Sequence, residues 1–78
     1  MEEYSITKGE IVELKQTMGF RVTEDRWTGF ADSHPSGCSN VEMVEFVKKW
    51  MDPPYKVDGD LDTHLQRILK AFVTFVRG

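Results

Sequence analysis

The sequence has only one cysteine, Cys38, among its 78 residues. A single cysteine excludes an internal disulfide and any zinc site built from several cysteines. No apolar run approaches the roughly 18 residues that a membrane-spanning helix needs. The first ten residues, MEEYSITKGE, are acidic and polar, unlike a signal peptide. We therefore expect one cytoplasmic domain over residues 1–78, stabilised by packing alone and without contact to a membrane.

The motifs of metal and phosphate sites are also missing. There is no glycine-rich phosphate loop. Asp58, Asp60 and Asp62 have the spacing of the first three ligands of a calcium loop, but Thr63 replaces the glycine of the sixth position and Leu69 the glutamate of the twelfth. We expect no metal or other cofactor, and we expect Asp60 to cap the last helix instead.

Few residues are suited to nucleophilic catalysis. Cys38 and His34 lie four residues apart in a loop that leads into a helix N-terminus, where the helix dipole favours a thiolate. A nucleophile also needs a general base and a group that orients it. The only other histidine, His64, lies at the edge of the apolar side of the last helix. The sequence therefore favours a protein that is not an enzyme.

The charge is acidic overall and uneven along the chain. Ten basic and 13 acidic residues give a net charge of -3. Residues 1–45 contain four basic and nine acidic residues, whereas residues 46–78 contain six basic and four acidic residues. Apolar residues make up 40% and charged residues 29%, which is typical of a folded globular chain.

The first predicted helix covers residues 8–18. Thr7 and Glu10 form a capping-box pattern before it, and Gly19 supplies a left-handed stop after it. Another amphipathic helix begins at Ser39 or Asn40. It ends before a pair of prolines, which lack the amide that a helix needs.

The segment at residues 61–78 is the strongest helix in the sequence. Its apolar side chains cover a sector of roughly 200°, about twice what a surface helix needs. The members of this sector are Leu61, Leu65, Ile68, Leu69, Phe72, Val73, Phe75 and Val76. Such a helix either lies at the centre of the fold or keeps apolar surface that one small core does not cover.

Residues 20–31 have two interpretations. In the first, Thr23 caps a short helix that has two acidic residues in its first turn. In the second, Phe20 and Val22 alternate with polar residues in the first strand of a β-hairpin. The helix is favoured, because Glu-Asp is a poor hairpin turn and Gly29 weakens the second strand. The predicted fold is thus an all-α bundle of about four helices, with a minor hairpin at residues 20–31 as the alternative.

The stretch ELKQTMGFRVTEDRWTGFAD resembles the first two helices of Cro and phage-repressor-like helix-turn-helix DNA-binding domains. With the helix that follows, the resemblance covers residues 8–52. It implies a transcriptional regulator whose phosphate and base contacts come from Arg21, Arg26, Lys48 and Lys49. The exposed side of the expected recognition helix carries three acidic residues and two lysines. This balance disfavours nucleic acid as the partner, because phosphate neutralisation drives most DNA affinity.

The sequence therefore favours a small non-enzymatic regulatory protein that binds a protein partner or forms a homodimer. The acidic N-terminal half and the wide apolar sector of the last helix motivate this interpretation. Trp50, Val73 and Phe75 are the expected contact residues, with Tyr55 at the rim of the contact. Trp27, Trp50 and Tyr55 together are candidates for an aromatic contact patch. In so small a domain, however, both tryptophans are expected in the core. A helix-turn-helix DNA-binding regulator is the alternative.

Overall fold

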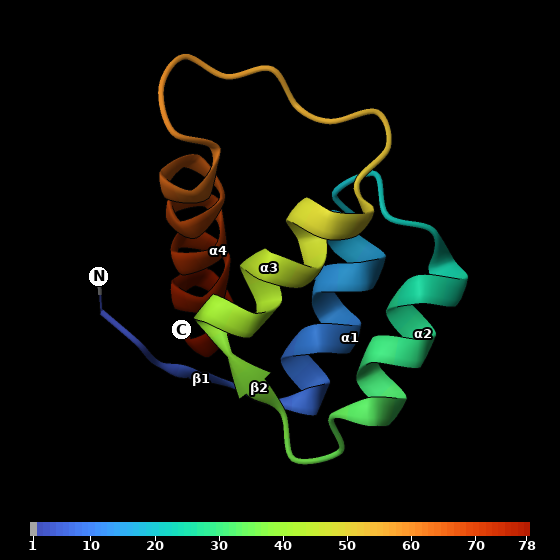
Figure 1. Ribbon diagram of the computed structural model, residues 1–78. Coiled ribbons are helices and arrows are strands. Elements are labelled where there is room, and N and C mark those ends of the chain that lie inside the picture. The colour runs from blue at the N-terminus through green and yellow to red at the C-terminus, as the bar shows by residue number, and fades with distance from the viewer. Residues whose placement is uncertain (1) are drawn as a thin grey trace.

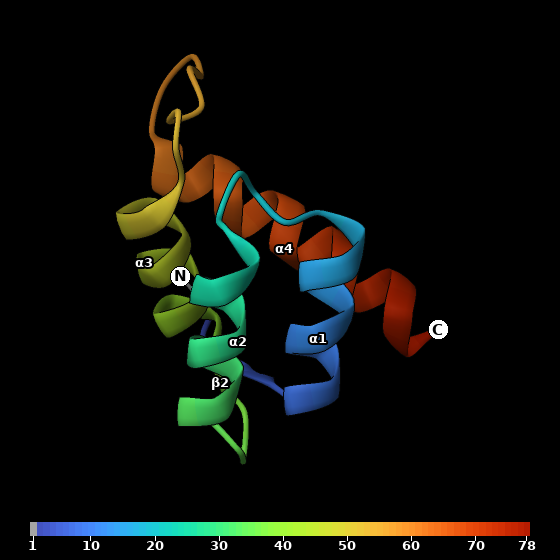
Figure 2. The same cartoon turned by 90° about the vertical axis from the view of Figure 1, so that its right-hand side faces the viewer.

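Four helices and a two-stranded antiparallel sheet make up the computed structural model, which describes residues 2–78. The elements in chain order are β1 Ser5–Ile6, α1 Lys8–Thr17, α2 Glu24–Ser33, β2 Cys38–Ser39, α3 Asn40–Trp50 and α4 Leu61–Arg77. The helices α1 and α2 pack side by side, and α4 packs against both α3 and α1 (Figures 1 and 2). The predicted small, mainly helical fold is confirmed.

The helix starts follow from local hydrogen bonds that the sequence pattern indicates. The Thr7 hydroxyl accepts from the Glu10 amide at 3.1 Å, and Glu10 Oε1 accepts from the Thr7 amide at 2.9 Å. This is the predicted capping box of α1. At the start of α4, Asp60 Oδ2 accepts from the Thr63 amide at 3.2 Å. The predicted Asp60 cap is therefore confirmed.

The hairpin alternative for residues 20–31 is wrong, because Glu24–Ser33 form helix α2. Gly19, Phe20 and Arg21 have φ angles of +68°, +49° and +59°, so three consecutive left-handed residues turn the chain sharply after α1. Such a turn cannot continue as an extended strand. Thr23 occupies the N-cap position of α2, although its side chain makes no capping hydrogen bond.

The small sheet joins two segments that the sequence did not predict as strands. In β1 and β2, Ser5 pairs with Ser39 and Ile6 pairs with Cys38. The predicted loop that contains His34 and Cys38 thus ends in a strand. Gly37 makes this possible, because its φ is +90° and an added Cβ would meet the backbone of Ile6.

The core lies between all four helices. Trp27 of α2 is 1% exposed, and its indole N–H donates to the Gly19 carbonyl at 2.9 Å. The Trp27 ring meets the ring of Phe46 of α3 edge-on, with centroids 5.1 Å apart. The other large buried side chains of the core are Ile6, Ile11, Leu14, Met43, Val47, Leu65 and Leu69. The predicted core position of Trp27 is confirmed.

An ion pair ties the C-terminal end of α4 to the start of α1. Arg77 Nε lies 2.7 Å from Glu10 Oε2, and Arg77 Nη2 donates to Glu10 Oε1 at 2.9 Å and to the Ser5 carbonyl at 2.7 Å. The hydrogen bonds from Arg77 lower the pKa of Glu10 to about 2. The same carboxylate therefore caps α1 and holds α4.

We expect Glu10→Gln to remove part of the acid sensitivity of this protein. The folded-state pKa of Glu10 lies below its ordinary value of 4.5, so its contribution is fully present above about pH 4.5 and is lost as the pH falls towards 2. Glutamine still fits the capping box. The variant should therefore lose about 1 kcal/mol of unfolding free energy at pH 7, since partly exposed ion pairs are screened. Its loss of stability between pH 4.5 and 2 should be shallower than that of the wild type.

Urea unfolding at pH values from 2 to 7 would measure both quantities. Glu42→Gln is the matched control, because Glu42 forms the capping box of α3 with Ser39 but has no arginine partner. Equal pH profiles for the wild type and Glu10→Gln would contradict a role of the Arg77 pair in acid stability.

Candidate functional site

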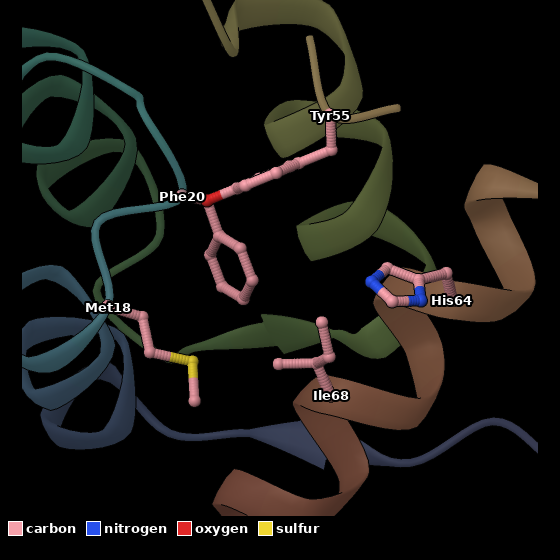
Figure 3. A pocket seen from close by; sticks show the side chains of 5 residues that line it. All are labelled: Met18, Phe20, Tyr55, His64 and Ile68. Carbon is pink, nitrogen blue, oxygen red and sulfur yellow. The ribbon is translucent and has the colours of Figure 1, made fainter. Parts of the chain in front are cut away.

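An apolar pocket lies between the end of α1, the linker from α3 to α4 and the first turns of α4 (Figure 3). Its volume is about 280 Å³. The lining side chains are Met18, Phe20, Tyr55, His64 and Ile68. We call it the end pocket. It is built by three separate segments of the chain, so only the folded protein assembles it.

The linker is held over the end pocket by Arg21. The Asp52 amide donates to the Arg21 carbonyl at 3.0 Å, and Arg21 Nη1 donates to the Pro53 carbonyl at 3.2 Å. The Arg21 guanidinium also lies 4.3 Å from the ring centroid of Tyr55. The left-handed turn buries Phe20 on the inner side of the same pocket. This turn therefore positions two of the five lining side chains.

A second apolar cleft continues from the end pocket along α4. It has a volume of about 330 Å³, and it shares Met18 with the end pocket. Its lining residues are Glu13, Thr17, Met18, Ala71, Phe72, Phe75 and Val76. We call this the side cleft, and the two hollows together the α1–α4 groove. Met18 is 41% exposed at their junction.

The two sides of α4 have different environments. One side is buried in the core through Leu65, Leu69, Phe72 and Val73. On the groove side, Phe75 is 84% exposed. In Figure 2 the red C-terminal turns of α4 project beyond the other helices, although Arg77 reaches back to Glu10 of α1. The wide apolar sector seen in the sequence is thus divided between the core and an open surface.

The ionisable groups of the groove are spread along it. His64 and Tyr55 line the end pocket, whereas Glu13 lines the side cleft. Cys38 is buried elsewhere in the fold, and burial raises the pKa of its thiol to about 12, with a further contribution from the charge of Glu42. Its thiolate is therefore scarce at neutral pH. Across residues 2–78, no group of three His, Cys, Asp or Glu side chains is placed to hold a metal ion.

The four residues expected at a partner contact separate in the structure. Tyr55 and Phe75 both line the α1–α4 groove, at opposite ends. Trp50 lines a different hollow between α2 and α3, where the Arg26 guanidinium lies 3.5 Å from its ring centroid. Val73 is only 4% exposed and belongs to the core. The expectation that Val73 lies at a contact surface therefore has to be corrected.

The four basic residues of the DNA-binding alternative are also engaged within the protein. Arg21 binds the linker, and the cationic groups of Arg26 and Lys49 lie 3.5 and 5.3 Å from the ring centroid of Trp50. Lys48 Nζ lies 3.7 and 3.8 Å from two carboxylates. Their cationic groups thus already have anionic, carbonyl or aromatic partners.

Sequence reasoning missed several residues of the groove. Met18, the last residue of the first predicted helix, is the C-cap residue of α1 and is partly exposed. Phe20 and Tyr55 line the same pocket because the left-handed turn places one side chain there and the linker places the other. Ile68 belonged to the wide apolar sector of α4, which was the one signal in the sequence for this surface.

Over the part of the chain that the structure describes, no helix has both the length and the apolar character needed to cross a membrane. Comparison of the chain with protein-family models, with curated proteins and with solved structures gives no significant match.

Proposed function

We propose that this is a small non-enzymatic regulatory protein that binds another polypeptide in the α1–α4 groove. The observation that carries this proposal is the continuity of two apolar hollows, which meet at Met18 and end at the exposed ring of Phe75. Exposed apolar surface of this kind marks interaction sites in small globular proteins. The two hollows follow one another along α4, which suits a chain segment better than a compact small molecule.

The length of the groove along α4 matches that of a short amphipathic helix. His64, Ile68, Ala71 and Phe75 fall within about 60° on the surface of α4 at 100° per residue. They extend over about 16 Å along the helix axis. A partner helix of about three turns would match this length and present apolar residues at positions i, i+3 or i+4, and i+7.

DNA binding stays a prediction. The four basic residues named for it already contact groups of the protein itself, which disfavours their use on phosphates. A DNA-binding protein would show affinity that falls steeply with salt. Binding through the α1–α4 groove would depend little on salt, because its lining is mainly apolar.

Photo-crosslinking from the centre of the groove tests the proposal. We expect p-benzoylphenylalanine at position 18, irradiated in an extract of the cells that make this protein, to give a discrete adduct that mass spectrometry identifies. Phe75→Glu in the same chain should abolish this adduct, because the charge would have to be buried on binding. The control is the same probe at Thr28, an exposed position of α2 that lines neither hollow. If positions 18 and 28 gave the same adducts, insensitive to Phe75→Glu, the groove would not be a binding site.

A further inference from the structure

Two features of α4 are complementary to each other but lie too far apart to meet within one molecule. Phe75 projects a ring that is 84% exposed. The end pocket, beside His64 and Ile68, offers about 280 Å³ of apolar space. A cavity of about 150 Å³ is already large enough for benzene. The end pocket can therefore accept a phenyl ring, but Phe75 is seven and eleven residues from the pocket side chains of its own helix, or about 10 to 16 Å.

An antiparallel arrangement of two copies of α4 brings both features together twice. When the ring of Phe75 lies over positions 64 and 68 of the other copy, the reciprocal contact forms at the same time. The two-fold axis then passes close to position 71, midway between the two features. Ala71 occupies this position and lines the side cleft. A small side chain at the crossing point lets two helices approach closely.

The charges at the two ends of the groove favour the antiparallel direction. Glu13 lines the groove near Phe75, whereas the exposed Lys56 follows Tyr55 at the opposite end. An antiparallel pair places Glu13 of one copy near Lys56 of the other, while a parallel pair would place the two Glu13 side chains together. At the lysine end, Asp60 accepts from the Thr63 amide and Asp62 lies 3.8 Å from Lys48, whereas Asp58 is exposed.

We propose that the polypeptide bound in the α1–α4 groove is a second copy of this chain, in a two-fold symmetric homodimer with antiparallel α4 helices and Phe75 of each copy in the end pocket of the other. This inference rests on the proposed function, since it names the partner of the same groove. The contact closes on itself, so it produces a dimer and not a filament.

Disulfide trapping at the expected two-fold axis tests the geometry. We expect Ala71→Cys to form a symmetric disulfide-linked dimer under mild oxidation, because residues on the axis face their own counterparts at a distance that a disulfide spans. The native Cys38 does not compete, since it is buried and its thiol pKa is about 12. Thr28→Cys on α2 is the control and should stay monomeric under the same conditions. Adding Phe75→Glu to Ala71→Cys should prevent the cross-link.

Sedimentation equilibrium of the unmodified chain gives the second measurement. The wild type should be a dimer, and Phe75→Ala should weaken dimerisation by about thirtyfold, as expected for a central aromatic anchor. Because Phe75 is exposed, its substitution should leave the thermal unfolding of the monomer unchanged. A monomeric wild type, together with cross-linking of Ala71→Cys no faster than that of Thr28→Cys, would overturn the dimer.

The two proposals fail in distinguishable ways. If the wild type is monomeric while the probe at position 18 captures a different protein in a manner that needs Phe75, the dimer is wrong and the groove remains a polypeptide-binding site. If the adduct has twice the mass of the chain, both proposals are supported. If position 18 gives no specific adduct and the chain is monomeric, both are overturned.

Discussion

Replacing Gly37 with alanine should lower the free energy of unfolding by about 3 kcal/mol and the melting temperature by about 15 °C. The φ of Gly37 is +90°, and a Cβ at this position would collide with the Ile6 carbonyl and lie 3.1 Å from Thr7 Cα. These are backbone atoms, so no side-chain movement relieves the contact. The β1–β2 pairing, which joins Ile6 to Cys38, would have to open. Such a loss is a large part of the roughly 4 to 12 kcal/mol expected for a chain of this length.

Gly59→Ala is a matched control for this change. Gly59 has nearly the same φ, +93°, but no atom lies within 4 Å of the position of an added Cβ. It should therefore show only the backbone cost of a left-handed alanine, about 1 kcal/mol. Thermal unfolding followed by circular dichroism would measure both variants. If the two glycines gave equal losses, the close approach of Gly37 to β1 would not matter for stability.

Trp27→Ala should be at least as damaging, with a loss of about 4 kcal/mol. The side chain is 1% exposed and fills the space between α2 and α3, where it meets Phe46 and Phe30 edge-on at centroid distances of 5.1 and 6.5 Å. Its indole N–H also holds the Gly19 carbonyl, at the start of the left-handed turn that places Phe20 in the end pocket. Loss of Trp27 should thus destabilise the core and disorder one wall of the groove.

Two further substitutions separate these contributions. Trp27→Phe keeps a ring but removes the hydrogen bond to Gly19, so we expect an intermediate loss of about 2 kcal/mol. Trp50→Phe should cost less than about 1 kcal/mol, because Trp50 is only half-buried and its main polar contact is the stacked Arg26. Urea unfolding should be followed by far-ultraviolet circular dichroism and not by tryptophan fluorescence, because each variant removes one of the two tryptophans. A loss for Trp50→Phe equal to that for Trp27→Phe would contradict this assignment of the core.

Substitutions in the groove should behave differently from these core changes. Phe75 makes little contact with its own molecule, so its replacement should affect association and leave the unfolding of the monomer unchanged. Gly37 and Trp27 act on the scaffold that forms the groove. Comparison of unfolding and association in the same set of variants therefore separates loss of fold from loss of binding.

The resemblance to helix-turn-helix domains stays a prediction. In that resemblance α2 is the supporting helix and α3 the recognition helix. The chain between α2 and α3 contains β2, which pairs with β1 near the N-terminus. In the helix-turn-helix motif a three- or four-residue turn joins the two helices. Here the intervening segment also holds the N-terminal strand, and the first residue of α3, Asn40, accepts from the Tyr4 amide through its side chain at 2.9 Å.

Local sequence patterns determined the starts and ends of the helices. The Thr7–Glu10 capping box, the left-handed Gly19 and the Asp60 cap are formed by residues within a few positions of each other, so the neighbouring sequence is sufficient to specify them. Helical periodicity likewise identified the core side of α4 through Leu65 and Leu69. The same pattern signalled that α4 has more apolar surface than its core contacts need, but it did not separate the buried Val73 from the exposed Phe75.

Only the tertiary structure decided which residues meet across long distances in the chain. The pairing of β1 with β2 depends on the close approach of Gly37 to Ile6, and the end pocket depends on Arg21 holding the linker that carries Tyr55. These contacts join segments separated by about 30 residues, and no local propensity or periodicity encodes them. The side of α4 that is left open is likewise set by where α1 ends, because a helix pattern specifies which residues are apolar but not which neighbour covers them.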